Sequence, residues 1–203
     1  MLATMAEKKT TFGLTLSNRA LVTKGTTARE LIDMAVAAEN TGFIDAIWVG
    51  DSILSKPRLE CIPLLGAIAA HTSRVKLGVA CMATIAQRNP VLLALQWASL
   101  DVLSGGRTWL AACMGYPASQ HPMAAKELEV MGVQSKERPG RLEEMLQALR
   151  VLWTSWALRA RLFYPWLSPP IAKRASSTTS ARTSAAAAPF GSYTVTPCPP
   201  PHA

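Results

Sequence analysis

The sequence has no uninterrupted apolar run of about 18 residues, the length that a membrane-spanning helix requires. Its first eleven residues include Lys8 and Lys9, but no apolar segment follows them, so we expect no secretory signal. Both absences argue against a membrane protein and make a cytoplasmic location our expectation. Hydrophobic residues nevertheless make up 49% of the 203 residues, which predicts one substantial domain with a well-formed core.

The sequence also lacks the spacings that metal sites use. Its four cysteines contain no Cys-x-x-Cys pair, and its three histidines are scattered, so we expect no metal site. Cys61, Cys81 and Cys113 lie within helix or strand patterns, where a buried free thiol is the common case. We therefore expect free thiols and no disulfide.

Acidic residues are absent after Glu144, and this absence explains most of the net charge of +8. Residues 155–203 contain five basic residues and no acidic one, which leaves sixteen basic and thirteen acidic residues in 1–154, a net charge of +3. The nearly balanced part shows no basic stripe with interleaved aromatic residues. The sequence therefore does not predict a nucleic-acid-binding surface.

Apolar periodicity predicts four successive strand-plus-helix units. The predicted strands are 11–16, 43–49, 75–82 and 108–113, and the predicted helices are 27–40, 63–71, 90–104 and 139–153. Thr27 and Glu30 form a capping box at the first helix, and Pro90 occupies the first turn of the third. Because the strands begin roughly 30 residues apart, the length of one β/α unit, we expect a parallel sheet with right-handed crossovers.

A two-glycine turn connects the third predicted helix to the fourth predicted strand. Gly105 and Gly106 come directly after Ser104, where glycine permits the positive φ angle of a helix end. We expect Arg107 to remain in solvent while the apolar run that follows it enters the sheet. So short a passage from helix to buried strand is typical of a β/α protein.

No Gly-x-Gly-x-x-Gly turn follows the first predicted strand, which disfavours a dinucleotide-binding Rossmann unit. A (β/α)₈ barrel is the better parent fold, although a complete one takes about 250 residues. The four predicted units are half of the eight that such a barrel contains. We therefore predict an α/β fold that is a partial (β/α)₈ TIM barrel.

The composition changes near Ser155. Eight of the fourteen prolines lie in the last 39 residues, and no apolar period continues there. We predict a flexible segment at 1–10, a β/α domain at 11–154 and a basic, Pro/Ala/Ser-rich tail at 155–203 that is irregular or disordered. A shift of reading frame or a truncation near codon 155 is our hypothesis for the change.

Several segments, in order along residues 11–154, resemble the luciferase-like monooxygenases and in particular their deazaflavin-dependent branch. They are Ala46–Ser52, Pro57–Glu60, Thr72–Gly78, Asn89–Ala94, Leu100–Arg107, Glu137-Arg138, Gly140–Glu144 and Leu152–Thr154. The resemblance implies a (β/α)₈ barrel that uses coenzyme F420 or FMN at the C-terminal mouth of its strands.

The resemblance implies an oxidoreductase or monooxygenase that acts on a small organic substrate by hydride transfer or oxygen activation. It names no substrate, and a homodimer is a further option. The alternative is a truncated, catalytically inactive half-barrel that self-associates through its open sheet edge or is unstable.

The resemblance also suggests site residues. Asp51 follows the second strand, where it would orient substrate or cofactor as the catalytic residue, or else cap a turn. Ala80, Cys81 and Met82 match a bulge that lies behind the cofactor ring, or else form an ordinary buried strand end.

Two further places match cofactor-binding positions of the family. Gly115 and Tyr116 follow the fourth strand, where glycines let the cofactor approach. Asn89, together with Arg88 and Arg107, would meet phosphate or the acidic tail of the coenzyme, or else these are solvated loop residues.

Overall fold

The computed structural model describes residues 10–163 and 192–195. The strands are β1 (Gly13–Leu16), β2 (Ala46–Val49), β3 (Lys76–Met82), β4 (Thr108–Ala112) and β5 (Ser192–Val195). The α-helices are α1 (Ala28–Asn40), α2 (Cys61–His71), α3 (Pro90–Ser104), α4 (Pro122–Val130) and α5 (Arg138–Phe163). Short 3₁₀ helices occur at η1 (Ile85–Gln87), η2 (Ala118–Gln120) and η3 (Ser135–Glu137).

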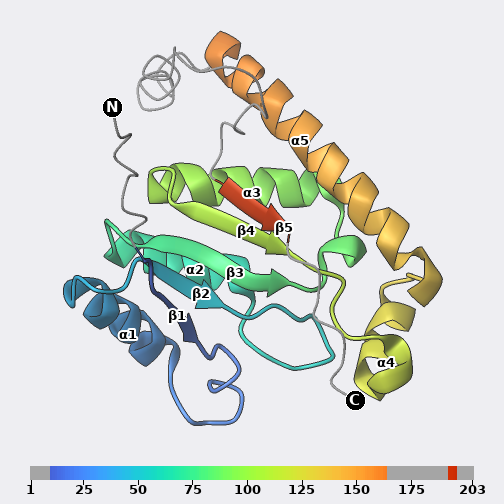
Figure 1. Ribbon diagram of the computed structural model, residues 1–203, viewed down its shortest axis with the longest axis horizontal. Coiled ribbons are helices and arrows are strands. Elements are labelled where there is room, and N and C mark those ends of the chain that lie inside the picture. Colours follow the sequence, from blue (N-terminus) through green and yellow to red (C-terminus); the bar gives the residue numbers. More distant parts are fainter. Residues whose placement is uncertain (1–9, 164–191, 196–203) are drawn as a thin grey trace, which may run out of the picture.

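The strands form one parallel sheet in the order β1-β2-β3-β4-β5 (Figure 1). Neighbours in the sheet are thus neighbours in sequence, as in a barrel wall, whereas a doubly wound sheet reverses its strand order. The predicted partial (β/α)₈ barrel is confirmed.

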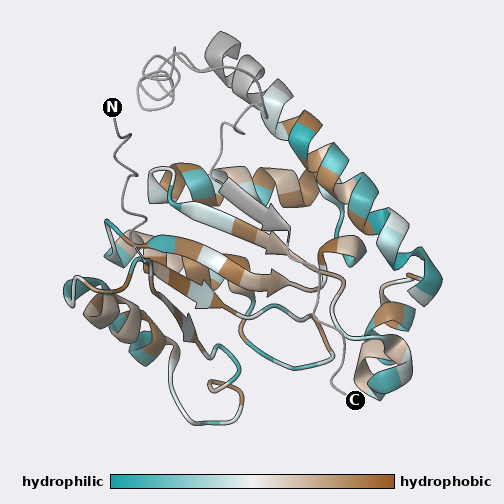
Figure 2. Cartoon of the chain, in the orientation of Figure 1, coloured by the Kyte–Doolittle hydropathy of each residue, from teal (hydrophilic) through white to brown (hydrophobic). Residues whose placement is uncertain are grey.

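The core lies between the sheet and its helices. Ile47 and Val49 of β2 and Leu77 and Val79 of β3 have no exposed surface, because alternate residues of these strands face the helices. The helices contribute apolar residues spaced by three or four positions: Leu31 and Ala35 of α1, Leu64, Leu65 and Ile68 of α2, Leu93 and Trp97 of α3, and Met145, Leu149 and Trp153 of α5. Figure 2 shows the apolar residues along β3, β4 and α3.

Two tryptophans lie on the opposite face of the sheet. The ring centroids of Trp48 on β2 and Trp109 on β4 are 5.8 Å apart. Gly78 on β3 lies between them in the sheet, paired in register with Trp48 and with Trp109. A Cβ atom at Gly78 would overlap the Trp48 ring and lie 2.9 Å from the carbonyl oxygen of Trp109, so only glycine leaves room for this arrangement.

The predicted helix ends are confirmed. The Thr27 side chain accepts from the backbone N–H of Glu30, whose carboxylate accepts from the N–H of Thr27, completing the capping box. Gly105 and Gly106 have φ angles of 70° and 81°, and the Gly106 N–H donates to the carbonyl of Asp101. The left-handed conformation at both glycines ends α3 and turns the chain toward β4.

The expectation that Arg107 stays in solvent is wrong. Arg107 is buried, and its guanidinium donates to oxygens of Ala69, Thr72, Val75 and Ser104. Carbonyls at the end of a helix lack partners within the helix, and the planar, five-donor guanidinium satisfies several of them at once. Arg107 therefore joins the ends of α2 and α3 to the start of β3.

The structure adds elements that the periodicity did not predict. Helix α4 lies between β4 and α5, helix α5 continues to Phe163, and β5 pairs with β4. The other residues of the predicted tail, 164–191 and 196–203, and residues 1–9 of the predicted flexible segment lie outside the described residues. Among the residues described, every helix is too short or too polar to cross a membrane.

The Trp48 contact generates a prediction about Gly78. We expect Gly78→Ala to destabilise the protein by about 1–3 kcal/mol, because the added methyl group overlaps the Trp48 ring. Urea unfolding followed by circular dichroism measures the change. Gly66→Ala is the matched control, since no atom lies within 4 Å of a Cβ there. In the middle of α2 it should stabilise by about 0.5–1 kcal/mol, and equal destabilisation by both variants would contradict the packing argument.

Candidate functional site

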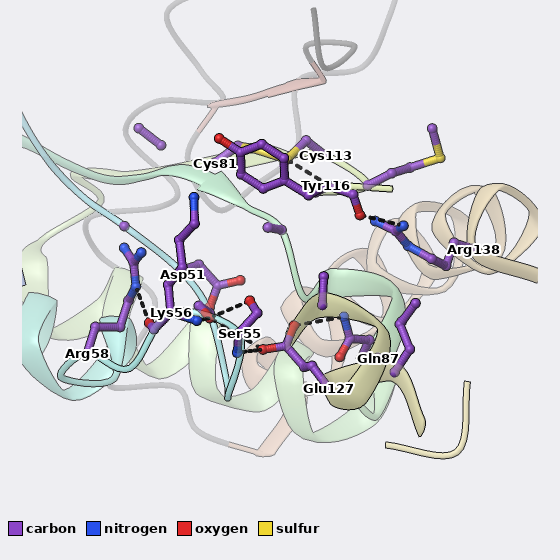
Figure 3. A pocket seen from close by; sticks show the side chains of 18 residues that line it. Asp51, Ser55, Lys56, Arg58, Cys81, Gln87, Cys113, Tyr116, Glu127 and Arg138 are labelled. Carbon is purple, nitrogen blue, oxygen red and sulfur yellow. Dashed lines mark hydrogen bonds between the residues drawn. A yellow bond between two sulfur atoms is a disulfide. The ribbon is translucent and has the colours of Figure 1, made fainter. Parts of the chain in front are cut away.

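A cavity of about 270 Å³ lies at the carboxyl ends of β2, β3 and β4 (Figure 3). This is the end of a parallel β/α sheet at which ligands bind. Its lining comes from the loop after β2, the end of β3, η1, the segment after β4, α4 and the first residue of α5. The lining residues are Gly50, Asp51, Ser52, Ser55, Lys56, Arg58, Ala80, Cys81, Ala83, Gln87, Cys113, Met114, Gly115, Tyr116, Ala124, Glu127, Leu128 and Arg138.

The side chain of Asp51 is 1% exposed and is engaged by neighbouring groups. One carboxylate oxygen accepts from the backbone N–H of Thr84 at 2.8 Å and from its hydroxyl at 2.7 Å. The other oxygen accepts from Nη2 of Arg88 at 2.8 Å. Asp51 therefore connects the end of β2 to the segment between β3 and α3, which positions the cavity wall.

Arg88 lies among three potential metal ligands. Ligand atoms of Asp51, Glu60 and Cys61 all lie within 4.8 Å of one another. Nη2 of Arg88 is 3.0 Å from Glu60 and 3.9 Å from the Cys61 sulfur, and it also pairs with Asp51. The guanidinium thus balances the carboxylates, and burial together with Asp51 raises the pKa of the Cys61 thiol, which stays protonated. This arrangement favours an internal ion-pair network over a metal centre.

Glu127 of α4 holds the loop after β2 in place. One of its oxygens accepts from the consecutive backbone N–H groups of Ile53, Leu54 and Ser55 at 2.9, 2.5 and 2.8 Å. The other accepts from Nε2 of Gln87 at 3.3 Å. Burial opposes ionisation, but the N–H donors outweigh it, and the pKa of the Glu127 carboxyl lies below its ordinary value.

Cationic side chains on the same loop line the cavity. The Arg58 guanidinium lies against Gly50, where a Cβ atom would overlap it. It donates to the Lys56 carbonyl and the Asn18 side chain, and no carboxylate of the described chain lies within ion-pairing distance. Burial lowers the pKa of Arg58. Lys56 places its ammonium 4.0 Å from the Tyr116 ring centroid.

The wall formed by β3 and β4 contains small residues and a disulfide. The register between the strands shifts between Val79 and Met82, which is the expected bulge, and the Ala80–Cys81 peptide is cis. Cys81 and Cys113 form a disulfide, so the expectation of free thiols is wrong for this pair. Parallel neighbouring strands bring the two Cα atoms to 5.9 Å, within disulfide range, although 32 positions separate them in sequence.

The cavity brings together five of the seven predicted site residues, namely Asp51, Ala80, Cys81, Gly115 and Tyr116. The remaining two have other contacts. Met82 is completely buried in the core, because its side chain points to the helices. The Asn89 side chain accepts from the N–H groups of Val91 and Leu92 as the N-cap of α3, and it is not among the lining residues.

Sequence reasoning missed several lining residues, among them Lys56, Arg58, Gln87 and Glu127. The first two belong to a loop that directly follows a parallel strand, and that position alone marks them as candidates. Gln87 and Glu127 are buried polar residues whose role depends on a contact between distant segments. The Oε1 atom of Gln87 is buried and makes no hydrogen bond within the described structure.

The fold and the cavity define a parallel β/α-barrel protein with a cavity at the carboxyl ends of its strands. The sequence pattern of the luciferase-like monooxygenases matches residues 10–188. The chain therefore belongs to this family, as its sequence segments predict.

One curated relative is the F420-dependent glucose-6-phosphate dehydrogenase of Amycolatopsis mediterranei (strain U-32), which is 32% identical over 133 residues. The match covers 63% of this chain and 38% of the relative. The chain thus spans less than half the length of the curated relatives it matches.

Two solved structures show the same fold. An F420-dependent secondary alcohol dehydrogenase in complex with an F420–acetone adduct has a TM-score of 0.57 and 22% identity, over 71% of this chain and 42% of that one. The FMN complex of the oxygenating constituent of 3,6-diketocamphane monooxygenase from Pseudomonas putida has a TM-score of 0.53 and 19% identity, over 70% and 39%.

The Glu127 contacts generate a pH-dependent prediction. We expect Glu127→Gln to destabilise the protein by about 2–3 kcal/mol near neutral pH, because the charged acceptor of the loop N–H groups is lost. The pKa of the Glu127 carboxyl in the folded protein lies below its ordinary value, so the ionised carboxylate stabilises the fold at every pH above that ordinary value. This stabilisation disappears as the pH falls through the folded-state pKa, and the two proteins should converge.

Urea unfolding of both proteins at neutral and acidic pH measures this convergence. Glu129→Gln is the matched control, since Glu129 lies on the same helix in an exposed ion pair with Lys126. Its effect should stay within about 0.5 kcal/mol at neutral pH. A Glu127→Gln effect that persists unchanged in acid would show that the carboxylate charge is not what holds the loop.

Proposed function

We propose that this chain forms part of an oxidoreductase that uses coenzyme F420 or FMN on a small organic substrate. The observation that carries the proposal is the cavity between the carboxyl ends of β2, β3 and β4 in a chain of this family. Relatives and structural neighbours of the chain are named for F420 or bind FMN, which supports either cofactor.

The cavity wall fits a planar ring. The surface beside the disulfide is backbone and small side chains, from Ala80, Ala83 and Gly115. Gly115 has a φ of 65°, and a Cβ atom there would lie 3.1 Å from the Ala83 Cβ, so a larger residue would crowd this wall. The volume of 270 Å³ is just below the lower limit of about 300 Å³ for small-molecule pockets, which suits a ring more than a whole cofactor.

Different side chains of the cavity would bind different parts of the cofactor. Lys56 and Arg58 would attract the anionic groups of the cofactor, which F420 and FMN both carry, and Tyr116 would offer a flat apolar contact. The Gln87 amide, with its unpaired buried oxygen, is available to a ligand N–H group. When bound, F420 supplies hydride transfer and FMN supplies hydride transfer or oxygen activation.

Asp51 is a positioning residue in this proposal. Its carboxylate is already bound by Thr84 and Arg88, and it therefore shapes the cavity and leaves proton transfer to other groups. The same contacts join the loop after β2 to Thr84, which precedes η1, so Asp51 would act on a ligand through the position of this segment.

Titration of FMN and of F420 with the full chain, followed by quenching of cofactor fluorescence, tests the proposal. We expect saturable binding of one of them, weakened about tenfold by Arg58→Gln, which removes one charge-assisted contact of about 1.4 kcal/mol. Arg29→Gln is the matched control, because Arg29 is an exposed arginine on α1 that pairs with Asp33.

The outcomes separate the assignment of function from the role of Arg58. If neither cofactor binds saturably to the folded chain, the proposed function is wrong. If a cofactor binds and Arg58→Gln weakens it no more than Arg29→Gln does, the cationic loop is not its binding surface.

A further inference from the structure

We propose that Cys81 and Cys113 form a thiol-exchange site, at which a small anionic thiol forms a mixed disulfide with Cys81 inside the cavity. This inference goes beyond the proposed function and does not depend on cofactor binding. It rests on where the two sulfurs lie, on the hydrogen bond to one of them and on the charge of the cavity.

The two cysteines differ in access to the cavity. Both residues line it, but Cys81 is half-buried, whereas Cys113 is 4% exposed. Figure 3 shows the pair on the cavity wall near Tyr116. An incoming thiol therefore reaches the Cys81 sulfur more readily, and disulfides that are open to solvent are the ones that exchange.

The backbone favours Cys113 as the leaving sulfur. The N–H of Gly115 points at the Cys113 sulfur at 3.4 Å. A backbone donor stabilises a thiolate more than it stabilises a neutral sulfur, because the acceptor is charged. Since exchange is faster when the leaving thiolate is stable, the bond breaks toward Cys113.

The charge of the cavity selects the thiol. Lys56 and Arg58 line the same space, while the carboxylates of Asp51 and Glu127 are bound by internal donors. The cations should attract an anionic thiol and raise the fraction of its reactive thiolate form. Cys61 is a poor competitor, because it is buried and its thiol stays protonated.

The exchange proceeds in balanced steps. The incoming thiolate attacks the Cys81 sulfur, a new S–S bond forms there, and the Cys81–Cys113 bond breaks as its electron pair leaves on Cys113. A second molecule of the same thiol attacks the mixed disulfide and releases the oxidised small-molecule disulfide. The protein pair ends as two thiols, and two thiol molecules have supplied the electrons.

Glutathione is the probe for the first test. Two variants of the full chain, Cys113→Ser and Cys81→Ser, each keep one cysteine of the pair, and both also carry Cys198→Ser, since Cys198 lies outside the described residues. With glutathione disulfide, we expect the chain that keeps Cys81 to gain one glutathione at least about tenfold faster than the chain that keeps Cys113, because the buried Cys113 sulfur is out of reach of so large a disulfide even though the Gly115 N–H stabilises its thiolate. Intact-mass spectrometry measures both rates, and circular dichroism checks the fold. Equal rates, a faster Cys113, or no adduct on either folded chain would overturn the proposal.

A second measurement keeps both cysteines of the pair, so it does not depend on the folding of the Cys81→Ser or Cys113→Ser chain. The Cys198→Ser chain is treated with reduced glutathione, quenched with acid and digested, and the peptides are mapped by mass. Glutathione on Cys81 supports the proposal. Glutathione on Cys113, or a Cys81–Cys113 bond that resists reduction, contradicts it.

Comparison with a cationic thiol tests the role of charge. We expect glutathione to reduce the native pair several-fold faster than cysteamine does at equal thiolate concentration, and Lys56→Gln or added salt to diminish that preference. Lys24→Gln, on the exposed loop after β1, is the control and should leave the preference unchanged. A preference for cysteamine would contradict selection of anionic thiols.

Discussion

The cavity depends on the buried Asp51 carboxylate. It follows β2 but is bound by Thr84 and Arg88, which lie after β3, so one side chain connects the ends of adjacent β/α units. A buried carboxylate without such donors would be unstable. The contacts that neutralise Asp51 therefore also hold the loops after β2 and β3 at a fixed separation, and these loops form one side of the cavity.

The two carboxylates of the cavity are paired with groups of the protein itself, and this pairing determines the charge of the surface that a ligand contacts. Asp51 is compensated by Arg88, and Glu127 by the backbone donors of the loop after β2. Lys56 and Arg58 form no ion pair within the described chain, so the lining presents positive charge although acidic residues are present. Counting charged residues in the sequence misses this difference, because it depends on which partners each charge has.

Patterns between sequence neighbours predicted the four units, the Thr27 capping box and the glycine turn after Ser104, because periodicity and capping are local properties. Contacts between distant segments were not predictable in this way. The Cys81–Cys113 bond requires the register of β3 and β4, and the loop contacts of Glu127 require the position of α4. The burial of Arg107 was not predicted for the same reason, since most of its partners lie about one β/α unit earlier in the chain.

Arg107 also bears on how the chain folds. The carbonyls at the end of α2 gain their donors only when the turn of the next unit arrives, about one β/α unit later. The turn after α3 thus completes the end of α2, the kind of nearest-neighbour interface on which repeat proteins depend for stability. Loss of this link would weaken the coupling between neighbouring units, so that they would unfold more independently of one another.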